Sequence, residues 1–200
     1  MRIIAGSFRS RTLQAPPGLA TRPTSDRLRE TLFNVLAPRI QDAVFLDLYA
    51  GSGAVGIEAL SRGAARVEFV ERAPAALKIL RGNLEKLGIT AGFHIHSAAV
   101  GAFLRRAVEI PKLERHEVVR EVYEVVFLDP PYDAAPEYAA TLGLLGGAAA
   151  GLLGAGALVI AEHRRKERPL DRLEERYGSL QRTRLLEQGD AALSFYSCLR

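Results

Sequence analysis

The chain has 200 residues, of which 48% are hydrophobic and 25% are charged, as is typical of a globular domain. This length and composition exclude intrinsic disorder, collagen and a coiled coil as descriptions of the whole chain. The single cysteine, Cys198, excludes an internal disulfide and a cysteine-rich metal cluster, and it favours a reducing compartment.

The basic residues are concentrated at the start of the chain. Residues 1–40 contain seven arginines and two acids and carry +5, while the whole chain carries +4. A basic segment on a nearly neutral body indicates contact with a polyanion, and the alternative is charge that only solubilises the protein. A second basic cluster at 163–168 follows a predicted strand. It is expected to form one wall of a groove whose other wall is the basic segment at the start of the chain.

The first elements predicted along the chain are a short hairpin over residues 2–13 and a helix. Thr24 is the expected N-cap of this helix, which extends to about Asn34, with Pro38 marking its end. No apolar run reaches the length of a membrane span, and the start of the chain lacks the apolar core of a signal peptide. We therefore expect a cytoplasmic protein.

Apolar strands then alternate with helices. Such a repeat predicts an α/β fold in which a mostly parallel sheet is covered on both faces. A closing hairpin at 180–199 is expected to add one antiparallel strand, giving seven strands. The expected strands are 44–48, 66–71, 93–97, 124–128, 157–161, 180–186 and 192–199.

A glycine-rich turn follows the first strand. Gly51, Gly53 and Gly56 fit the pattern G-x-G-x-x-G, and Glu71 follows 20 residues after Gly51 at the end of the second strand. This spacing is the dinucleotide fingerprint, so an NAD-dependent oxidoreductase is one interpretation. Asp47 argues against it, because a carboxylate repels a pyrophosphate and favours the cationic S-adenosylmethionine. An ordinary βα turn with a capping aspartate is the structural alternative.

The fourth strand ends in Asp129-Pro130-Pro131-Tyr132. Adjacent prolines cannot continue a central strand, and they make the loop rigid at the edge of the sheet where such folds bind ligands. Asp129 and the backbone carbonyls can accept both hydrogens of an exocyclic NH₂, while Tyr132 offers a face on which a base can stack. We expect this loop to hold a planar amine for methyl transfer.

These strings resemble a class I S-adenosylmethionine-dependent methyltransferase and, more narrowly, the bacterial small-subunit ribosomal RNA guanine-N2 methyltransferases. The likeness rests on residues 2–6, 22–34, 46–53, 129–132 and 193–196. It implies a Rossmann-like fold with a hairpin extension over 1–20 and a methyltransferase domain over 21–200, forming one domain overall. It also implies methylation of guanine N2 in 16S ribosomal RNA, within the assembling small subunit or as naked RNA. A monomer without a metal ion is expected.

The resemblance also implies roles for individual residues. Asp129, Pro130, Pro131 and Tyr132 are the expected catalytic residues. One departure is the run His96-Ser97-Ala98-Ala99, where we would look for an Asp or Asn facing the adenine amine. The expected cofactor-binding residues are Thr24, Arg27, Asp47, Tyr49, Ala50, Gly51, Gly53, Glu71, Arg72, Ser97 and Ala98. The expected RNA-binding residues are Arg2, Arg9, Arg11, Arg22, Arg164 and Arg165.

Two further functions stay open. One is an amino-methyltransferase of a different planar amine, either adenine N6 in nucleic acid or a protein glutamine. The other is a non-catalytic RNA-binding assembly factor that has kept the pocket. His94 and His96 share one strand face, but no third ligand is near in sequence, so no metal site is expected.

Overall fold

The computed structural model describes residues 1–15, 25–109, 122–131, 135–165 and 173–199. These residues form two compact units, Met1–Ala98 and Ala99–Arg200, and each unit is described by itself. No helix among the described residues is long and apolar enough to cross a membrane. The predicted division into an extension over 1–20 and one domain over 21–200 stays a prediction.

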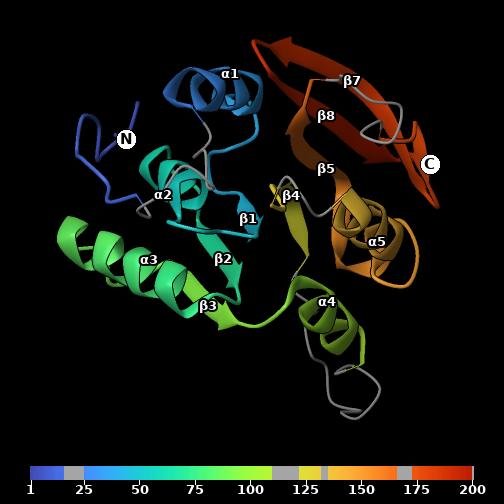
Figure 1. The fold of residues 1–200 in the computed structure, drawn as a ribbon, viewed down its shortest axis with the longest axis horizontal. Coiled ribbons are helices and arrows are strands. Elements are labelled where there is room, and N and C mark those ends of the chain that lie inside the picture. Colours follow the sequence, from blue (N-terminus) through green and yellow to red (C-terminus); the bar gives the residue numbers. More distant parts are fainter. Residues whose placement is uncertain (16–24, 110–121, 132–134, 166–172, 200) are drawn as a thin grey trace. The chain divides into compact units, whose positions relative to one another are not determined.

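The first unit contains three parallel strands in the order β3-β2-β1 (Figure 1). Phe45 of β1 and Phe69 of β2 are fully buried, while β3 alternates apolar and polar residues and is partly exposed. The predicted strands 44–48, 66–71 and 93–97 are confirmed. The elements are α1 (Asp26–Leu36), β1 (Val44–Leu48), α2 (Ala54–Ser61), β2 (Arg66–Glu71), α3 (Pro74–Leu87) and β3 (Phe93–Ser97).

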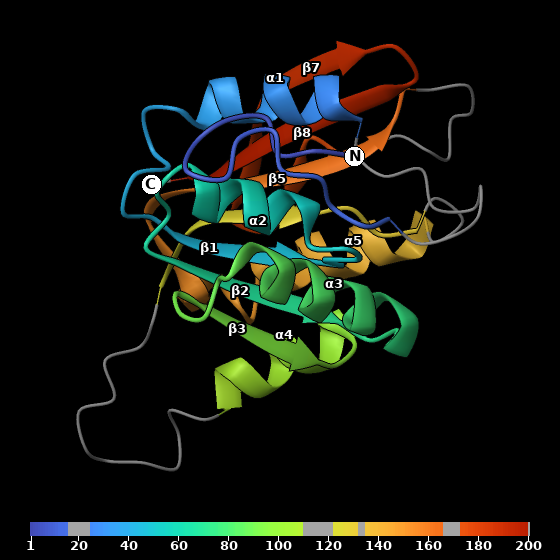
Figure 2. The same ribbon diagram turned by 90° about the vertical axis from the view of Figure 1, so that its left-hand side faces the viewer.

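The two helices that follow β1 and β2 differ in how far they are buried. α3 buries a stripe that includes Leu77, Leu80 and Leu84, as expected for an amphipathic surface helix. Pro74 is compatible with its first turn, and Gly88 ends it with φ +71°. α2 contacts both β1 and β2 and is buried along nearly its whole length. Figure 2 shows α2 beside the N-terminal stretch of the chain.

The start of the chain differs from the prediction in two details. Ser25, not Thr24, is the N-cap of α1, because its Oγ accepts a hydrogen bond of 3.1 Å from the backbone N–H of Leu28. Thr24 itself lies outside the described residues. The expected hairpin is formed in part, since Arg2 bridges Thr12, Ile3 N donates to the Arg11 carbonyl and Leu13 N donates to the Met1 carbonyl. The N–H groups of Ile4 and Ala5 bond to Glu58 instead.

The second unit combines parallel and antiparallel strands. β4 and β5 pair in parallel, while β8 lies antiparallel between β5 and β7. The predicted α/β fold with antiparallel C-terminal strands is confirmed. The described residues contain eight strands, not the seven expected, because the short β6 adds to the edge. The elements are α4 (Val100–Glu109), β4 (Tyr123–Leu128), α5 (Ala135–Leu145), the 3₁₀ helix η2 (Ala150–Leu152), β5 (Leu153–Arg164), β6 (Arg176–Tyr177), β7 (Leu180–Gln188) and β8 (Ala191–Cys198).

β5 corrects the expected position of the second basic cluster. The strand continues to Arg164, so His163 lies inside it and pairs with Ala192 of β8. The His163 side chain is buried, its Nε2 lies 2.8 Å from Ser194 Oγ, and burial lowers its pKa. His163 is therefore a neutral core residue and not part of a basic groove wall. Residues 166–172 lie outside the described residues.

Candidate functional site

The carboxyl ends of β1, β2 and β3 carry most of the residues that were expected to bind the cofactor. The three strands are parallel, so these ends lie at one edge of the first unit. Ala50 donates its backbone N–H to Val70, and Ala98 donates to the carbonyl of Glu71. The structure brings together at this edge Asp47, Tyr49, Ala50, Gly51, Gly53, Glu71, Arg72, Ser97 and Ala98.

The turn after β1, residues 49–53, depends on its glycines. Gly51 and Gly53 have φ of +57° and +78°, which favours glycine. A Cβ on Gly53 would lie 2.2 Å from Leu80 Cδ1, so this position allows α3 to pack close to the turn. Among the described residues, a Cβ on Gly51 would meet only the Tyr49 carbonyl, at 3.9 Å, which leaves room for a ligand to approach the backbone.

Asp47 supports the start of α2. Its side chain is buried, and Oδ2 accepts a hydrogen bond of 2.9 Å from the backbone N–H of Gly56. Burial raises the Asp47 pKa to about 7, the Gly56 hydrogen bond opposes this effect, and the charge on Glu71 adds to it. A cationic group placed here would therefore stabilise the ionised carboxylate.

Glu71 holds the backbone on both sides of the site. One carboxylate oxygen accepts from Gly51 N at 2.9 Å, and the other accepts from Arg72 N and Ala73 N at 2.8 and 2.7 Å. Three of the roughly four acceptor positions of a carboxylate are thus in use. About one acceptor position remains for a ribose hydroxyl of a bound nucleoside, and a second hydroxyl would have to share a position or displace the Gly51 amide.

Sequence reasoning missed Asn83, which contacts the same turn from α3. Its side chain is fully buried, and Nδ2 donates to the Ser52 carbonyl at 2.9 Å. The signal was available, since Asn83 falls three residues after Leu80 on the apolar side of the helix. A polar residue at such a position needs a buried partner, and here the partner is the glycine-rich turn.

α1 carries Arg27, which is expected to bind the cofactor. Arg27 is exposed, and its carbonyl accepts a hydrogen bond from Thr31 Oγ1. The hydrogen bonds that hold the turn come from Glu71 and Asn83, not from Arg27. Its role near the cofactor stays a prediction.

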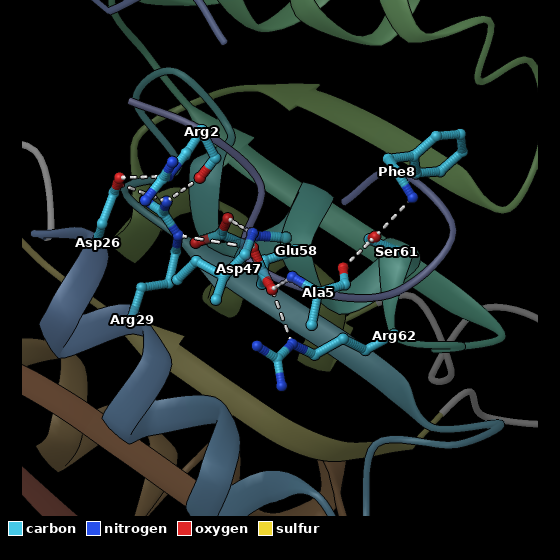
Figure 3. A network of polar contacts seen from close by, with 11 residues as sticks. Arg2, Ala5, Phe8, Asp26, Arg29, Asp47, Glu58, Ser61 and Arg62 are labelled. Carbon is cyan, nitrogen blue, oxygen red and sulfur yellow. Dashed lines mark hydrogen bonds and ion pairs between the residues drawn. The ribbon is translucent and has the colours of Figure 1, made fainter. Parts of the chain in front are cut away.

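Residues 1–15, named here the N-terminal segment, are fastened to α1 and α2. Glu58 is fully buried and accepts from the backbone N–H groups of Ile4 and Ala5 at 2.8 and 3.0 Å (Figure 3). Arg62 Nε donates to the same carboxylate at 2.7 Å. Arg29, also fully buried, donates to the Arg2 carbonyl and to Asp26. Sequence reasoning missed this network, although charged residues within the otherwise apolar helix α2 indicate it.

The arginines expected to bind RNA differ in their surroundings. Arg9 and Arg11 are exposed on the N-terminal segment. Arg2 is exposed too, but its Nε lies 3.8 Å from Asp26 Oδ2. In the second unit, Arg164 and Arg165 are exposed, and Arg165 Nε lies 3.2 Å from a Glu187 carboxylate oxygen. Arg22 lies outside the described residues.

The expected target loop follows β4 in the second unit. Asp129 is half-buried, Pro130 is buried and Pro131 is exposed, while Tyr132 lies outside the described residues. The prolines leave the strand without backbone donors at this point, so the loop turns away from the pairing with β5, which ends at Leu128. A carboxylate directly after a buried strand suits the binding of a hydrogen-bond donor.

The two histidines of β3 lie next to an acid of β2. His96 Nε2 contacts Glu68 Oε2, and Arg66 Nε lies 2.8 Å from Glu68 Oε1. Burial opposes ionisation of Glu68, but His96, Arg66 and His94 together lower its pKa. Among the described residues, no group of three or more His, Cys, Asp or Glu side chains is placed to hold a metal ion.

Known proteins resemble the chain over most of its length. The family model described as "Conserved hypothetical protein 95" matches residues 1–197. "Ribosomal RNA small subunit methyltransferase D" of Escherichia coli (strain K12) is 40% identical over 132 residues, which is 66% of this chain and 60% of that protein. The Haemophilus influenzae protein of the same name is 39% identical over 133 residues, covering 66% of this chain and 64% of its own.

A solved structure extends this similarity to the whole chain. The Escherichia coli protein yhhF is 32% identical, has a TM-score of 0.78, and the match covers 99% of this chain and 97% of that chain. By contrast, the matched segment spans less than two thirds of the two curated methyltransferases.

Proposed function

The chain belongs to the family described as conserved hypothetical protein 95 and is related to small-subunit ribosomal RNA methyltransferases, and from this premise we propose that it methylates ribosomal RNA. The donor is S-adenosylmethionine, and the acceptor is the exocyclic N2 amine of one guanine in 16S ribosomal RNA. The observation that carries the proposal is the buried Asp47 next to an open glycine-rich turn.

The residues of the turn fit this donor better than a dinucleotide. S-adenosylmethionine supplies an electrophilic methyl group on a sulfonium and carries an ammonium group, so it is cationic at its reacting end. Asp47 offers the opposite charge, whereas the pyrophosphate of NAD would meet a repelling carboxylate. Gly51 leaves the backbone accessible, and Glu71 and Arg72 border the ribose and adenine in this proposal.

The loop after β4 activates the acceptor. Asp129 and backbone carbonyls of the loop accept the two hydrogens of the guanine amine, which localises its lone pair on nitrogen. The nitrogen attacks the methyl carbon as the carbon–sulfur bond breaks, and the surplus proton passes to Asp129 or water. Positioning and electrostatics account for the rate, since no covalent intermediate with the protein is needed.

A direct assay tests the proposal. Small subunits from cells that lack this protein are incubated with it and with S-adenosylmethionine carrying a labelled methyl group. The expected result is label in 16S ribosomal RNA, and nucleoside mass spectrometry should identify N2-methylguanosine. Label on adenine or on protein would assign a different planar amine, and RNA binding without any label would indicate a non-catalytic assembly factor.

Asp129→Ala tests the role of the loop. The variant should bind the cofactor with nearly unchanged affinity, while kcat falls by at least about 100-fold because the amine is no longer held. Glu124→Ala removes an exposed acid from β4 and serves as the control that changes neither quantity. A large loss of cofactor affinity with little change in kcat would contradict the assignment.

A further inference from the structure

Asn83 joins two parts of the first unit that are far apart in sequence. Its Nδ2 donates to the carbonyls of Ser52 and Gln14 at 2.9 and 3.1 Å, and its Oδ1 accepts from Gln14 N at 2.8 Å. One fully buried amide thus satisfies backbone groups of both the glycine-rich turn and the N-terminal segment. If the amide were removed, the buried Ser52 carbonyl would lose this partner, which is costly, and the exposed Gln14 would lose both of its hydrogen bonds to α3.

The turn receives side-chain support at three successive points. Glu71 holds Gly51, Asn83 holds Ser52, and Asp47 holds Gly56 at the start of α2. Glu71 and Asp47 are acids at the ends of strands and were expected at the cofactor site. Asn83 comes instead from α3, and of these three supports it is the one that, within the described residues, also hydrogen-bonds to the N-terminal segment.

The N-terminal segment has two further anchors at residues that precede this contact in the chain. Lys86 Nζ donates to the Thr12 carbonyl at 2.9 Å, and Leu13 is buried between Thr12 and Gln14. At the other end, Glu58 of α2 binds the backbone of Ile4 and Ala5, as shown in Figure 3. A shift of the segment therefore changes the packing of both helices that flank the glycine-rich turn.

We propose that Asn83 is a positioning residue that couples the N-terminal segment to the cofactor-binding turn. The affinity for the cofactor then depends on the segment being seated at Gln14. Nucleic acid that contacts Arg9 and Arg11 holds the segment in place, so RNA and cofactor strengthen each other's binding. The RNA half of this inference rests on the proposed function, whereas the cofactor half requires only the geometry of the first unit.

Asn83→Leu tests the first half, because leucine has a similar size but no hydrogen-bonding groups. Its dissociation constant for S-adenosylhomocysteine, measured by calorimetry without RNA, should rise about 10-fold, as expected for the loss of buried hydrogen bonds. In turnover assays the KM for S-adenosylmethionine should rise while kcat stays nearly unchanged. Gln14→Ala is the matched control, since Gln14 takes part through its backbone alone and the affinity should not change.

A second control separates positioning from general loss of stability. Ser194→Ala removes a buried hydroxyl from β8 in the other unit, so it should lower the melting temperature without changing cofactor affinity. Lys86→Ala covers the case in which Asn83→Leu does not fold. Lys86 is exposed, and its substitution removes only the hydrogen bond to the Thr12 carbonyl. We expect the same dissociation constant to rise about 3-fold from the loss of this one hydrogen bond.

The second half is tested by adding a 16S ribosomal RNA fragment at saturation. The wild-type protein should bind S-adenosylhomocysteine at least about 3-fold more tightly with RNA than without it. Asn83→Leu, or Lys86→Ala if Asn83→Leu does not fold, should not show this gain in affinity. Unchanged affinity in Asn83→Leu, or in Lys86→Ala if the former is unfolded, would overturn the inference. A wild-type protein that binds no S-adenosylhomocysteine would overturn the proposed function as well, so the two failures are distinguishable.

Discussion

At the scale of single residues, Asp47 is the acid of the site whose pKa is raised by burial. Its carboxyl group is buried, and its pKa is raised from 3.8 to about 7, first by desolvation. Between about pH 4 and 7, Asp47 is therefore protonated in the folded protein but ionised in the unfolded chain. Ionised Asp47 destabilises the protein without ligand as the pH rises through this window, and a cationic ligand offsets that cost.

Asp47→Asn should remove this pH dependence, because asparagine keeps an acceptor for Gly56 N but does not titrate. The melting temperature of the ligand-free variant, relative to wild type, should rise between pH 4 and 8. Cofactor affinity of the wild type should fall about tenfold per pH unit well below the Asp47 pKa, while the variant loses this dependence. Parallel stability curves for the two proteins would show that Asp47 does not titrate in this range.

At the scale of elements, the contact between α2 and β2 depends on a glycine. A Cβ on Gly56 would lie 2.3 Å from Phe69 Cε1 and 2.8 Å from Val67 Cγ1, so the helix can approach the strand only without a side chain here. This approach sets the position of the first turn of α2, whose backbone N–H at Gly56 bonds to Asp47. Packing and site geometry therefore depend on the same residue.

Gly56→Ala should destabilise the protein by about 1–3 kcal/mol, since overpacking forces the helix or the Phe69 ring to move. Gly143→Ala is the matched control, because Gly143 lies in α5 and a Cβ there would have no neighbour within 4 Å. The control should be neutral or stabilising by up to about 1 kcal/mol through helix propensity. Urea unfolding measures both changes, and equal effects would contradict the packing argument.

At the scale of the whole molecule, the proposed binding of RNA depends on how charge is distributed over the chain. The stretch 1–40 carries +5 while the rest of the chain sums to −1, yet two of its arginines lie against acidic side chains. Arg29 is buried against Asp26 and Glu58, and Arg2 lies near Asp26. The usable charge for phosphate contacts is therefore smaller than the sequence count indicates, and Arg9 and Arg11 are its best candidates.

The double variant Arg9→Ala/Arg11→Ala should weaken RNA binding and lower the slope of log affinity against log salt by about 2, one for each lost phosphate contact. Arg105→Ala/Arg106→Ala removes equal charge from exposed positions on α4 and is the matched control. A filter-binding titration at several salt concentrations measures the slope. Equal slopes for the two double variants would remove the N-terminal segment from the interface.

The sequence predicted the strands of the first unit because their apolar residues either form a short run or alternate with polar ones, and turn-forming or charged residues bound each strand. It also predicted the G-x-G-x-x-G turn with its two acids, since local spacing alone brings Glu71 to the end of the strand next to Asp47. The N-cap of α1 was assigned to Thr24 instead of Ser25, because adjacent residues of the same capping type cannot be ranked without the backbone.

What the sequence determined by itself was the alternation of strand and helix, the glycine-rich turn and the Asp-Pro-Pro loop, all of which depend on neighbours within about a turn or a strand. Only the tertiary structure decided the partners of Asn83, Glu58 and Arg29, which bond to backbone groups 27 to 69 residues away. It also decided that His163 is buried against Ser194. Buried polar groups need hydrogen-bond partners, and because the fold brings these partners from distant parts of the chain, sequence spacing does not predict them.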